Sequence, residues 1–372
     1  MASKITLSNP SIPPGSLILV TGANGLIASH AADQLLAAGY RVRGAVRSAA
    51  KSSYLTELFA ARHGQHPQSP RLFELVEVPD VTVPGAWDAA VRGVAGIAHV
   101  VGAVEMSPQD ADAAAAAELK WQVALLEAAA REDSVKSFAL TASAWAAWTP
   151  DAARRGVVLG ADSWNDEAVA LARDASVPPQ AKGMAGFMAV KTLVERGVWE
   201  WVRRTRPAFA FNTLLLDTVI GEVLDPRHQG IPSTAGMVHW VWEGKHAAIL
   251  DSMAPQWHVD CRDAGRLFVA VLASSPLVDR ERVFVFGARY SWRRVWEVLR
   301  TLYPDHEMKA PKETGWDQTE VPNERGEELL GRVGQTSGWT SLEESVKKNA
   351  ASWLQLDGPV AADEKYMQLN GS

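Results

Sequence analysis

Two glycines and an alanine recur at three-residue intervals near the start of the chain, at Gly22, Gly25 and Ala28. They follow the apolar run at 17–20 directly and open a helical pattern that stops near Gly39. In such a strand–turn–helix unit the first glycine makes a tight turn, the second lets the backbone approach a pyrophosphate, and the small third residue allows close packing of helix on strand. The helix N-terminus then faces the phosphates of a dinucleotide. The residues expected to contact the dinucleotide are Gly22, Asn24, Gly25, Leu26 and Ile27.

The end of the second predicted strand, at 40–46, indicates which dinucleotide binds. An acidic side chain at this place accepts hydrogen bonds from the ribose hydroxyls of NAD, but this chain has basic residues there, led by Arg47 and Lys51. Because such groups suit the 2′-phosphate of NADP, we predict NADP as the cofactor. Asp80 and Val81, after the third strand, are expected near the adenine. The alternatives are ordinary surface charges and, for Asp80, a turn-forming side chain.

Short apolar runs alternate with helical patterns through the first part of the chain. The runs are continuous rather than alternating in polarity, which is typical of strands covered on both faces. Strands and helices in this order form a parallel sheet with right-handed crossovers. The sequence therefore predicts an α/β protein with a doubly wound, Rossmann-type sheet. The predicted strands lie at 17–20, 40–46, 72–78, 96–101, 138–141 and 209–216, and the predicted helices at 26–36, 51–61, 86–91, 111–131 and 183–199.

The pattern loosens after residue 216, where glycine and proline become frequent. We interpret the later elements as a smaller, C-terminal substrate-binding lobe, assembled from several excursions of the chain. The predicted boundaries are 1–218, with a return near 255–275, for the dinucleotide-binding domain and 219–254 plus 276–357 for the lobe. Residues 358–372 show no periodicity and are expected to form a flexible tail.

Several segments together resemble one known family, the extended short-chain dehydrogenases/reductases. Within it, the chain is most similar to fungal NADPH-dependent aldehyde and carbonyl reductases and to their relatives, the plant dihydroflavonol reductases. The similarity extends over nearly the whole chain and implies the fold predicted above. It rests on TGANGLIASH at 21–30, VRGAVRS at 42–48, ADSWN at 161–165, VDCRDAG at 259–265, LYP at 302–304 and SLEES at 341–345.

The resemblance also implies a catalytic set of Ser, Tyr and Lys, with the Lys four residues after the Tyr. In that family the Ser polarises a carbonyl group, the Tyr transfers a proton, and the Lys lowers the pKa of the Tyr while holding the nicotinamide ribose. Ser143 occupies the serine position and Lys191 the lysine position. The tyrosine position holds Phe187, which has no hydroxyl group to donate.

Phe187 leaves three functions open. The chain is a carbonyl reductase of a bulky hydrophobic ketone or aldehyde, in which the Tyr was replaced by design or lost naturally. Alternatively it is an NADP-binding, non-redox enzyme, such as a cyclase, isomerase or dehydratase of natural-product biosynthesis. A third hypothesis is a protein that senses the NADP redox state and reports to a partner. Further departures from the family pattern at Val190, Leu216 and Asp217 favour a natural change.

Other residues are expected to shape the substrate pocket. Glu105 and Asp217 follow the fourth and sixth predicted strands and would lie near the nicotinamide, although solvated or helix-capping carboxylates are the alternative. Four bulky side chains would flank the pocket, unless they serve only as core: Trp145, Trp148, Trp164 and Met188. His99, within an apolar strand, is expected to be a packed core residue.

Composition excludes several other classes of protein. The 372 residues include 37 basic and 43 acidic side chains, a formal charge of −6 that disfavours nucleic acid and anionic membranes as partners. The single cysteine, Cys261, can form no intrachain disulfide, and the absence of a signal peptide or an apolar span favours a cytoplasmic protein. No metal constellation or ATP-binding phosphate loop is present. The family resemblance implies a homodimer that forms through the helices at 111–131 and 183–199.

Overall fold

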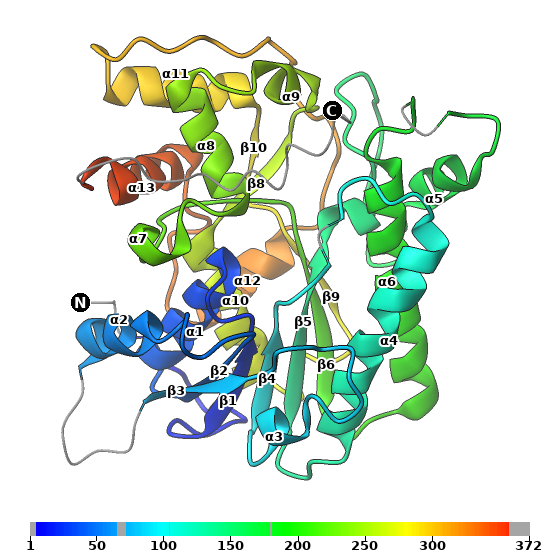
Figure 1. The fold of residues 1–372 in the computed structure, drawn as a ribbon, viewed down its shortest axis with the longest axis vertical. Coiled ribbons are helices and arrows are strands. Elements are labelled where there is room, and N and C mark those ends of the chain that lie inside the picture. Colours follow the sequence, from blue (N-terminus) through cyan, green and yellow to red (C-terminus); the bar gives the residue numbers. More distant parts are fainter. Residues whose placement is uncertain (1–4, 65–71, 104, 179–180, 357–372) are drawn as a thin grey trace.

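The larger of two sheets forms the centre of the molecule in this computed structural model, which describes residues 5–64, 72–103, 105–178 and 181–356. Its seven strands are all parallel and lie in the order β3-β2-β1-β4-β5-β6-β9 (Figure 1). This confirms the predicted doubly wound sheet. The strands are β1 (Leu17–Thr21), β2 (Arg41–Val46), β3 (Phe73–Glu77), β4 (Gly96–His99), β5 (Ser137–Ser143), β6 (Ala210–Leu216) and β9 (Arg282–Val285).

The strand order reverses direction at β1. From β1 the chain first builds outward through β2 and β3, then crosses back to the other side of β1 to add β4, β5 and β6. In a sheet of this type the connections after the two central strands diverge to opposite faces, which opens a crevice beyond their carboxyl ends. The strand order therefore places a ligand site beyond β1 and β4.

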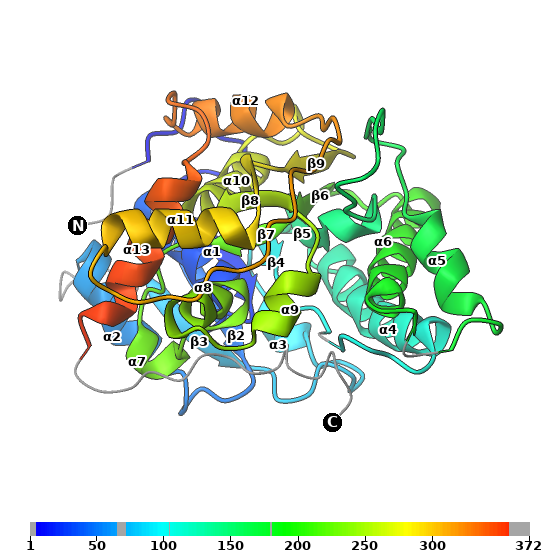
Figure 2. The same cartoon turned by 90° about the horizontal axis from the view of Figure 1, so that it is seen from above.

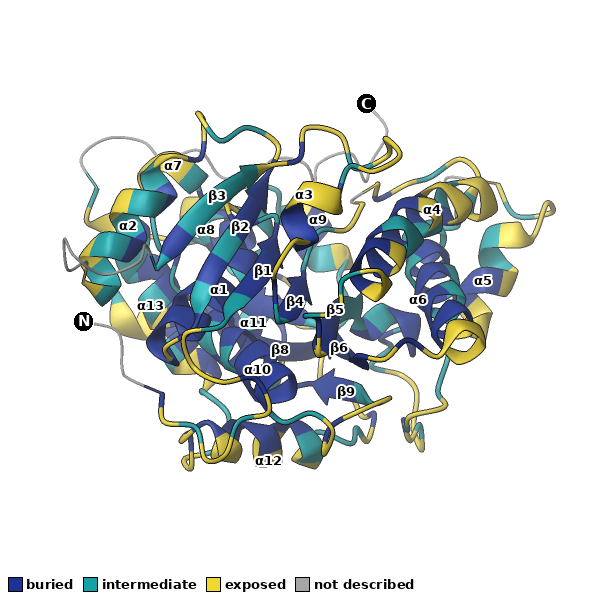
Figure 3. Cartoon of the chain, turned by 90° about the horizontal axis from the view of Figure 1, so that it is seen from below, coloured by how far each residue is buried: buried dark blue, intermediate teal, exposed yellow. Residues whose placement is uncertain are grey.

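Helices cover both faces of this sheet, so its central strands are mostly buried, whereas the edge strand β3 is only partly covered (Figures 2 and 3). On one face lie α1, α2, α10 and α12, and on the other lie α3, α4 and α6, with α5 packed on the outside of α6. Their bounds are α1 (Leu26–Ala37), α2 (Tyr54–His63), α3 (Asp88–Val91), α4 (Ala111–Ala130), α5 (Asp166–Arg173), α6 (Ala185–Thr205), α10 (Cys261–Ala273) and α12 (Glu324–Arg332).

A three-stranded sheet organises the remaining elements, which gather at the carboxyl-terminal edge of the larger sheet (Figure 1). Its central strand β8 is antiparallel to β10 and parallel to β7, and α8 and α13 pack on β7. These elements are β7 (Thr218–Ile220), β8 (Gln256–Asp260), β10 (Ala288–Tyr290), α7 (Pro226–Gln229), α8 (Ser233–Glu243), α9 (Ala247–Ser252), α11 (Trp292–Leu302) and α13 (Leu342–Leu354).

Two details differ from the predicted lobe boundaries. The range 276–357 contains β9, which extends the larger sheet by pairing with β6 instead of joining the lobe. The return near 255–275 is divided, because β8 belongs to the smaller sheet while α10 packs against α1 over the larger one. The predicted tail at 358–372 lies outside the described residues. Among the helices of the described ranges, none is both long and apolar enough to cross a membrane.

Close contact between α1 and α10 depends on Gly265. A Cβ atom at this position would lie 2.7 Å from the carbonyl oxygen of His30 and 2.9 Å from its carbonyl carbon. Both are backbone atoms of α1, so they cannot rotate away as a flexible side chain would. Gly331, on the exposed side of α12, has no atom within 4 Å of the same hypothetical Cβ.

We predict that Gly265→Ala and Gly331→Ala shift stability in opposite directions. The first forces α1 and α10 apart and should lower the free energy of unfolding by about 1–3 kcal/mol. The second removes backbone freedom from a helix without a clash and should raise it by about 0.5–1 kcal/mol. Urea denaturation followed by circular dichroism measures both. If both substitutions changed the free energy of unfolding equally, the contact between α1 and α10 would not be tight.

Candidate active site

The glycine turn at the end of β1 has the shape that a phosphate group requires. Gly22 has a φ of +65°, and a Cβ there would lie 2.7 Å from the Cγ2 atom of Val101, so only glycine fits. Gly25 precedes the first residue of α1, and the first turn of that helix contains no acidic side chain. Asn24 is exposed beside it, while Leu26 and Ile27 begin the helix. The first turn of α1, directly after the glycine turn, therefore offers backbone N–H groups and a favourable helix dipole, with no repelling carboxylate in that helical turn.

Two cationic side chains lie just beyond the neighbouring strand β2. Arg47 and Lys51 are both exposed, and within the described ranges neither forms an ion pair. The segment between them is tied to β3 by Glu77, whose Oε2 accepts a hydrogen bond from the backbone of Ala49 at 2.7 Å. This arrangement fits a phosphate bound at the end of β2, because both cations are free to turn toward it.

Asp80 has a local structural role at the end of β3. Its Oδ1 accepts hydrogen bonds from the backbone N–H of Thr82 at 2.8 Å and from the Thr82 hydroxyl at 2.6 Å. These bonds hold the pKa of Asp80 below its ordinary value. Val81, next to it, is partly exposed. Asp80 thus shapes a surface turn in the manner of an ordinary turn residue, and its other oxygen, Oδ2, is left for a ligand.

A cavity of about 710 Å³ opens beside the glycine turn, with Ile27 among its lining residues. It lies at the carboxyl ends of β5 and β6 and is closed on the other side by α6 and by residues of the lobe. The structure brings most of the predicted catalytic and pocket residues to its wall. Those lining it are Ser143, Trp145, Phe187, Met188, Lys191 and Asp217.

Ser143 ends β5 and faces this cavity. Its hydroxyl oxygen accepts a hydrogen bond from the backbone N–H of Trp145 at 3.2 Å, which fixes the side chain at the start of a short 3-10 helix. The oxygen has accepted one bond, so its proton stays available to donate to an oxygen atom of a ligand. The position therefore suits polarisation of a carbonyl group.

Phe187 and Lys191 lie one turn apart on α6, and the Lys191 ammonium sits 5.2 Å from the centre of the Phe187 ring. Lys191 Nζ donates a hydrogen bond of 2.7 Å to the carbonyl oxygen of Ala103. It also forms an ion pair of 3.4 Å with Glu118, a residue of α4 whose side chain is only 3% exposed. The ammonium is thus held at the cavity wall by two oxygen partners.

Sequence reasoning missed Glu118. The carboxylate Oε1 also accepts bonds from the backbone N–H of Ala103 at 3.2 Å and from the Gln122 side chain at 3.3 Å. The helical periodicity could have indicated it, because Glu118 lies on the same face of α4 as Ala115 and Gln122, and this face is buried. An acidic residue on a buried face requires a cationic partner, and Lys191 provides it.

Trp145 and Met188 form part of the bulky wall. The Trp145 indole N–H donates to Gln256 Oε1 at 2.8 Å, and its ring meets the Phe187 ring edge-on with centroids 5.8 Å apart. Met188 is buried on the same helix as Phe187. Because the indole is pinned by Gln256 of β8, the cavity has one rigid aromatic side toward the lobe.

Asp217 lines the cavity directly after β6. Its Oδ2 accepts a hydrogen bond from the backbone N–H of Trp257 at 2.9 Å, and the Thr218 hydroxyl lies 3.5 Å from Oδ1. Burial raises the pKa of Asp217 well above its ordinary value, and the negative charge of Asp317 raises it further. Since protonation removes the cost of burying a charge, the side chain is a neutral carboxylic acid at higher pH than an ordinary aspartate.

Three residues expected in the pocket lie elsewhere. Glu105 is exposed and does not reach the cavity wall. Trp148 is core: its indole N–H donates to the Thr319 hydroxyl at 3.1 Å, and its ring packs edge-on against Phe286. Trp164 lies in a different hollow. The sequence placed these side chains near the right strands but could not show which way their loops turn.

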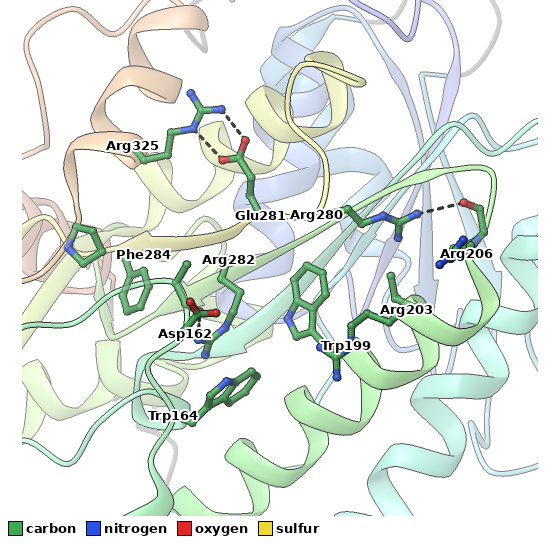
Figure 4. Close-up of a pocket in the computed structure, with 14 residues that line it drawn as sticks. Asp162, Trp164, Trp199, Arg203, Arg206, Arg280, Glu281, Arg282, Phe284 and Arg325 are labelled. Carbon is green, nitrogen blue, oxygen red and sulfur yellow. Dashed lines mark hydrogen bonds and ion pairs between the residues drawn. The ribbon is translucent and has the colours of Figure 1, made fainter.

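Trp164 stacks on the guanidinium of Arg282, 3.8 Å from the ring centre, in a cleft lined by five arginines at the amino-terminal end of β9 (Figure 4). Arg282 is fixed there by a buried ion pair with Glu195 at 2.9 Å and by the carbonyl oxygens of Ala161 and Ser163. Glu195 belongs to α6 and also lines the cavity of Ser143 and Lys191 described above. We call this hollow the arginine cleft.

His99 is a core residue, as expected. It is buried at the end of β4, its Nδ1 lies 2.8 Å from the Thr21 hydroxyl, and three aromatic rings surround it. Burial lowers the pKa of His99 to about 4. A neutral imidazole that joins β4 to β1 explains this side chain without any catalytic role.

Comparison with known proteins places the chain in a family. The model of the NAD dependent epimerase/dehydratase family matches residues 18–158. Aldehyde reductase 2 of Sporidiobolus salmonicolor is 34% identical over 92% of this chain and 97% of its own length. Ketoreductase adrE of Penicillium rubens is 35% identical over 92% and 98%, respectively.

Solved structures agree on the fold. Yeast methylglyoxal/isovaleraldehyde reductase Gre2, complexed with NADPH, superposes with a TM-score of 0.72 at 20% sequence identity, covering 91% of this chain and 98% of Gre2. The chain has the glycine turn of this fold and is similar to aldehyde and ketone reductases over nearly its whole length. It therefore belongs to the NAD-dependent epimerase/dehydratase family, the extended short-chain dehydrogenases/reductases.

Proposed function

We propose that this protein is an NADPH-dependent reductase of a bulky, hydrophobic ketone or aldehyde. The observation that carries the proposal is the shared cavity of Ser143 and Lys191, which opens beside the glycine turn at the switch point of the sheet. Relatives named aldehyde reductase 2 and ketoreductase adrE, similar over nearly their whole length, support reduction of a carbonyl group.

The described residues fit a bound NADPH. The glycine turn and the N-terminus of α1 would hold the pyrophosphate, and Arg47 and Lys51 would hold the 2′-phosphate. Asp80 Oδ2 and Val81 would lie beside the adenine, and Lys191 beside the nicotinamide ribose. NADPH, when bound, supplies the hydride that reduces the carbonyl carbon.

The cavity wall favours an apolar substrate of considerable size. Its volume of about 710 Å³ is within the usual range for drug-sized ligands. Apolar side chains from several helices, strands and loops line it, and Ser143 would donate its hydroxyl proton to the carbonyl oxygen at one end. The lining includes Met106, Leu171, Met188, Leu216, Met237 and Met253.

A second candidate is a non-redox enzyme, such as a cyclase, isomerase or dehydratase, and Phe187 is the observation that favours it. A site that lacks the phenol could use the cofactor as a structural element and hold a substrate in a reactive conformation. A redox-sensing role has less support, because a pure sensor has no need for a substrate-sized cavity with Ser143 and Lys191 on its wall. A homodimer through α4 and α6 also stays a prediction.

We predict that Arg47→Ala weakens NADPH binding selectively. Loss of hydrogen bonds from a cation to phosphate should raise the dissociation constant for NADPH about 10-fold or more, while the value for NADH, which has no 2′-phosphate, should hardly change. Isothermal calorimetry measures both constants. Arg203→Ala is a matched control, because Arg203 is equally exposed but lies in the arginine cleft. Parallel losses for both dinucleotides would contradict the assignment of Arg47.

We also predict that Phe187→Tyr increases the rate of NADPH oxidation. A phenol one helical turn from Lys191 supplies the missing general acid, which should raise kcat by about 10²-fold. The assay follows nicotinamide absorbance with a panel of aromatic and polycyclic ketones and aldehydes. Phe187→Leu, which removes the ring without adding a hydroxyl, should give no increase. If neither the wild type nor Phe187→Tyr oxidises NADPH with any compound of the panel, the protein is not a reductase of these substrates. Product formation without a change in nicotinamide absorbance would establish the second candidate.

A further inference from the structure

Reduction of a carbonyl group needs a proton on its oxygen, and Phe187 cannot supply one. Four carboxyl groups line the cavity: Glu118, Glu167, Glu195 and Asp217. The three glutamates are ion-paired with Lys191, Arg154 and Arg282, respectively. Each of these three carboxylates is therefore already engaged by a cation. Asp217 is the one carboxyl group of this set that has no cationic partner in the part of the chain that the structure describes.

The register of the sheet places Asp217 beside Ser143. In the parallel pairing of β5 with β6, Ser143 is the partner of Leu216, so Asp217 is the next residue beyond the end of the neighbouring strand. Both side chains face the same cavity. A carbonyl oxygen that accepts the Ser143 hydroxyl proton therefore lies at the edge from which Asp217 projects.

The surroundings of Asp217 favour its protonated form. Asp317 adds a negative charge nearby, and the buried Tyr290, on β10, donates its hydroxyl proton to Thr218 and not to Asp217. Trp257 donates one backbone N–H to Oδ2. Across the cavity, the Lys191 ammonium is engaged by Glu118 and the carbonyl oxygen of Ala103. The hydrogen bonds from Trp257 and Thr218 lower the pKa of Asp217, but they do not offset the desolvation of its carboxylate, to which Asp317 adds a negative charge.

We propose that Asp217 is the proton donor of this enzyme and takes the place of the missing phenol, an inference that rests on the proposed reductase function. The carbonyl carbon gains the hydride that the cofactor supplies, and the C=O π bond breaks as its electron pair moves to oxygen. That oxygen, hydrogen-bonded to Ser143, takes the Asp217 proton and becomes the alcohol. The Asp217 carboxylate then regains a proton from solvent.

The test compares Asp217→Asn in two backgrounds. Asn keeps the shape and the Trp257 bond but donates no acidic proton, so Asp217→Asn should lower kcat of the wild type about 10-fold or more. In Phe187→Tyr, where the phenol donates, the same change should have little effect. The wild-type rate should fall as pH rises and Asp217 ionises, whereas the Phe187→Tyr rate should not fall over that range.

Infrared spectroscopy gives a readout that needs no turnover. The protein should show a carboxylic-acid C=O band at pH values where an ordinary aspartate is ionised. This band should be absent from Asp217→Asn and should disappear as the pH rises further. Calorimetry should show the same NADPH affinity for both proteins.

Each contrary outcome has a distinct meaning. Equal losses in the two backgrounds, or a band that does not depend on Asp217, would overturn the role of Asp217. If only the two proteins that carry Phe187→Tyr oxidised NADPH, the donor role of Asp217 would be overturned while the proposed reductase function would stand. No NADPH oxidation in any of the four proteins would overturn the reductase function itself and the donor role with it.

Discussion

Parallel strands that all end at one edge are the constraint on which this site depends. The sheet fixes the glycine turn after β1, Ser143 at the end of β5 and Asp217 after β6, because each lies where its strand finishes. α6 adds Phe187 and Lys191 from the side, and α4 adds Glu118. Residues more than a hundred positions apart in sequence thus become neighbours without any disulfide, since the described chain holds one buried, unpaired cysteine. Loop variation then changes the chemistry while the framework stays the same.

Much of the fold was predictable from the sequence because its strands carry a strong signal. Continuous apolar runs, glycine at the first turn and helical periodicity between runs all indicate a buried parallel sheet, and six of the seven strands were expected at nearly their observed positions. β9 was missed. It has four residues and lies among the irregular segments of the lobe, so neither its length nor its context distinguished it from them.

The candidate site was predictable where a residue lies at the end of a strand or one turn from a known motif position. Ser143, Phe187, Lys191 and Asp217 all line one cavity. Glu105, Trp148 and Trp164 do not, since they lie in loops whose direction depends on tertiary contacts such as the bond from Trp148 to Thr319. Glu118 was hidden for the opposite reason: it lies within a regular helix, and only burial reveals that it must pair.

Glu195 gives the molecule a shared wall between two hollows that open on different sides. Its carboxylate closes the cavity from α6 and at the same time holds Arg282, on which Trp164 stacks in the arginine cleft. Thr213 and Trp199 donate further bonds to it, so the carboxylate has little freedom to move alone. Whatever displaces Arg282 therefore also releases the Glu195 carboxylate, so a change in the arginine cleft is transmitted to the wall of the cavity.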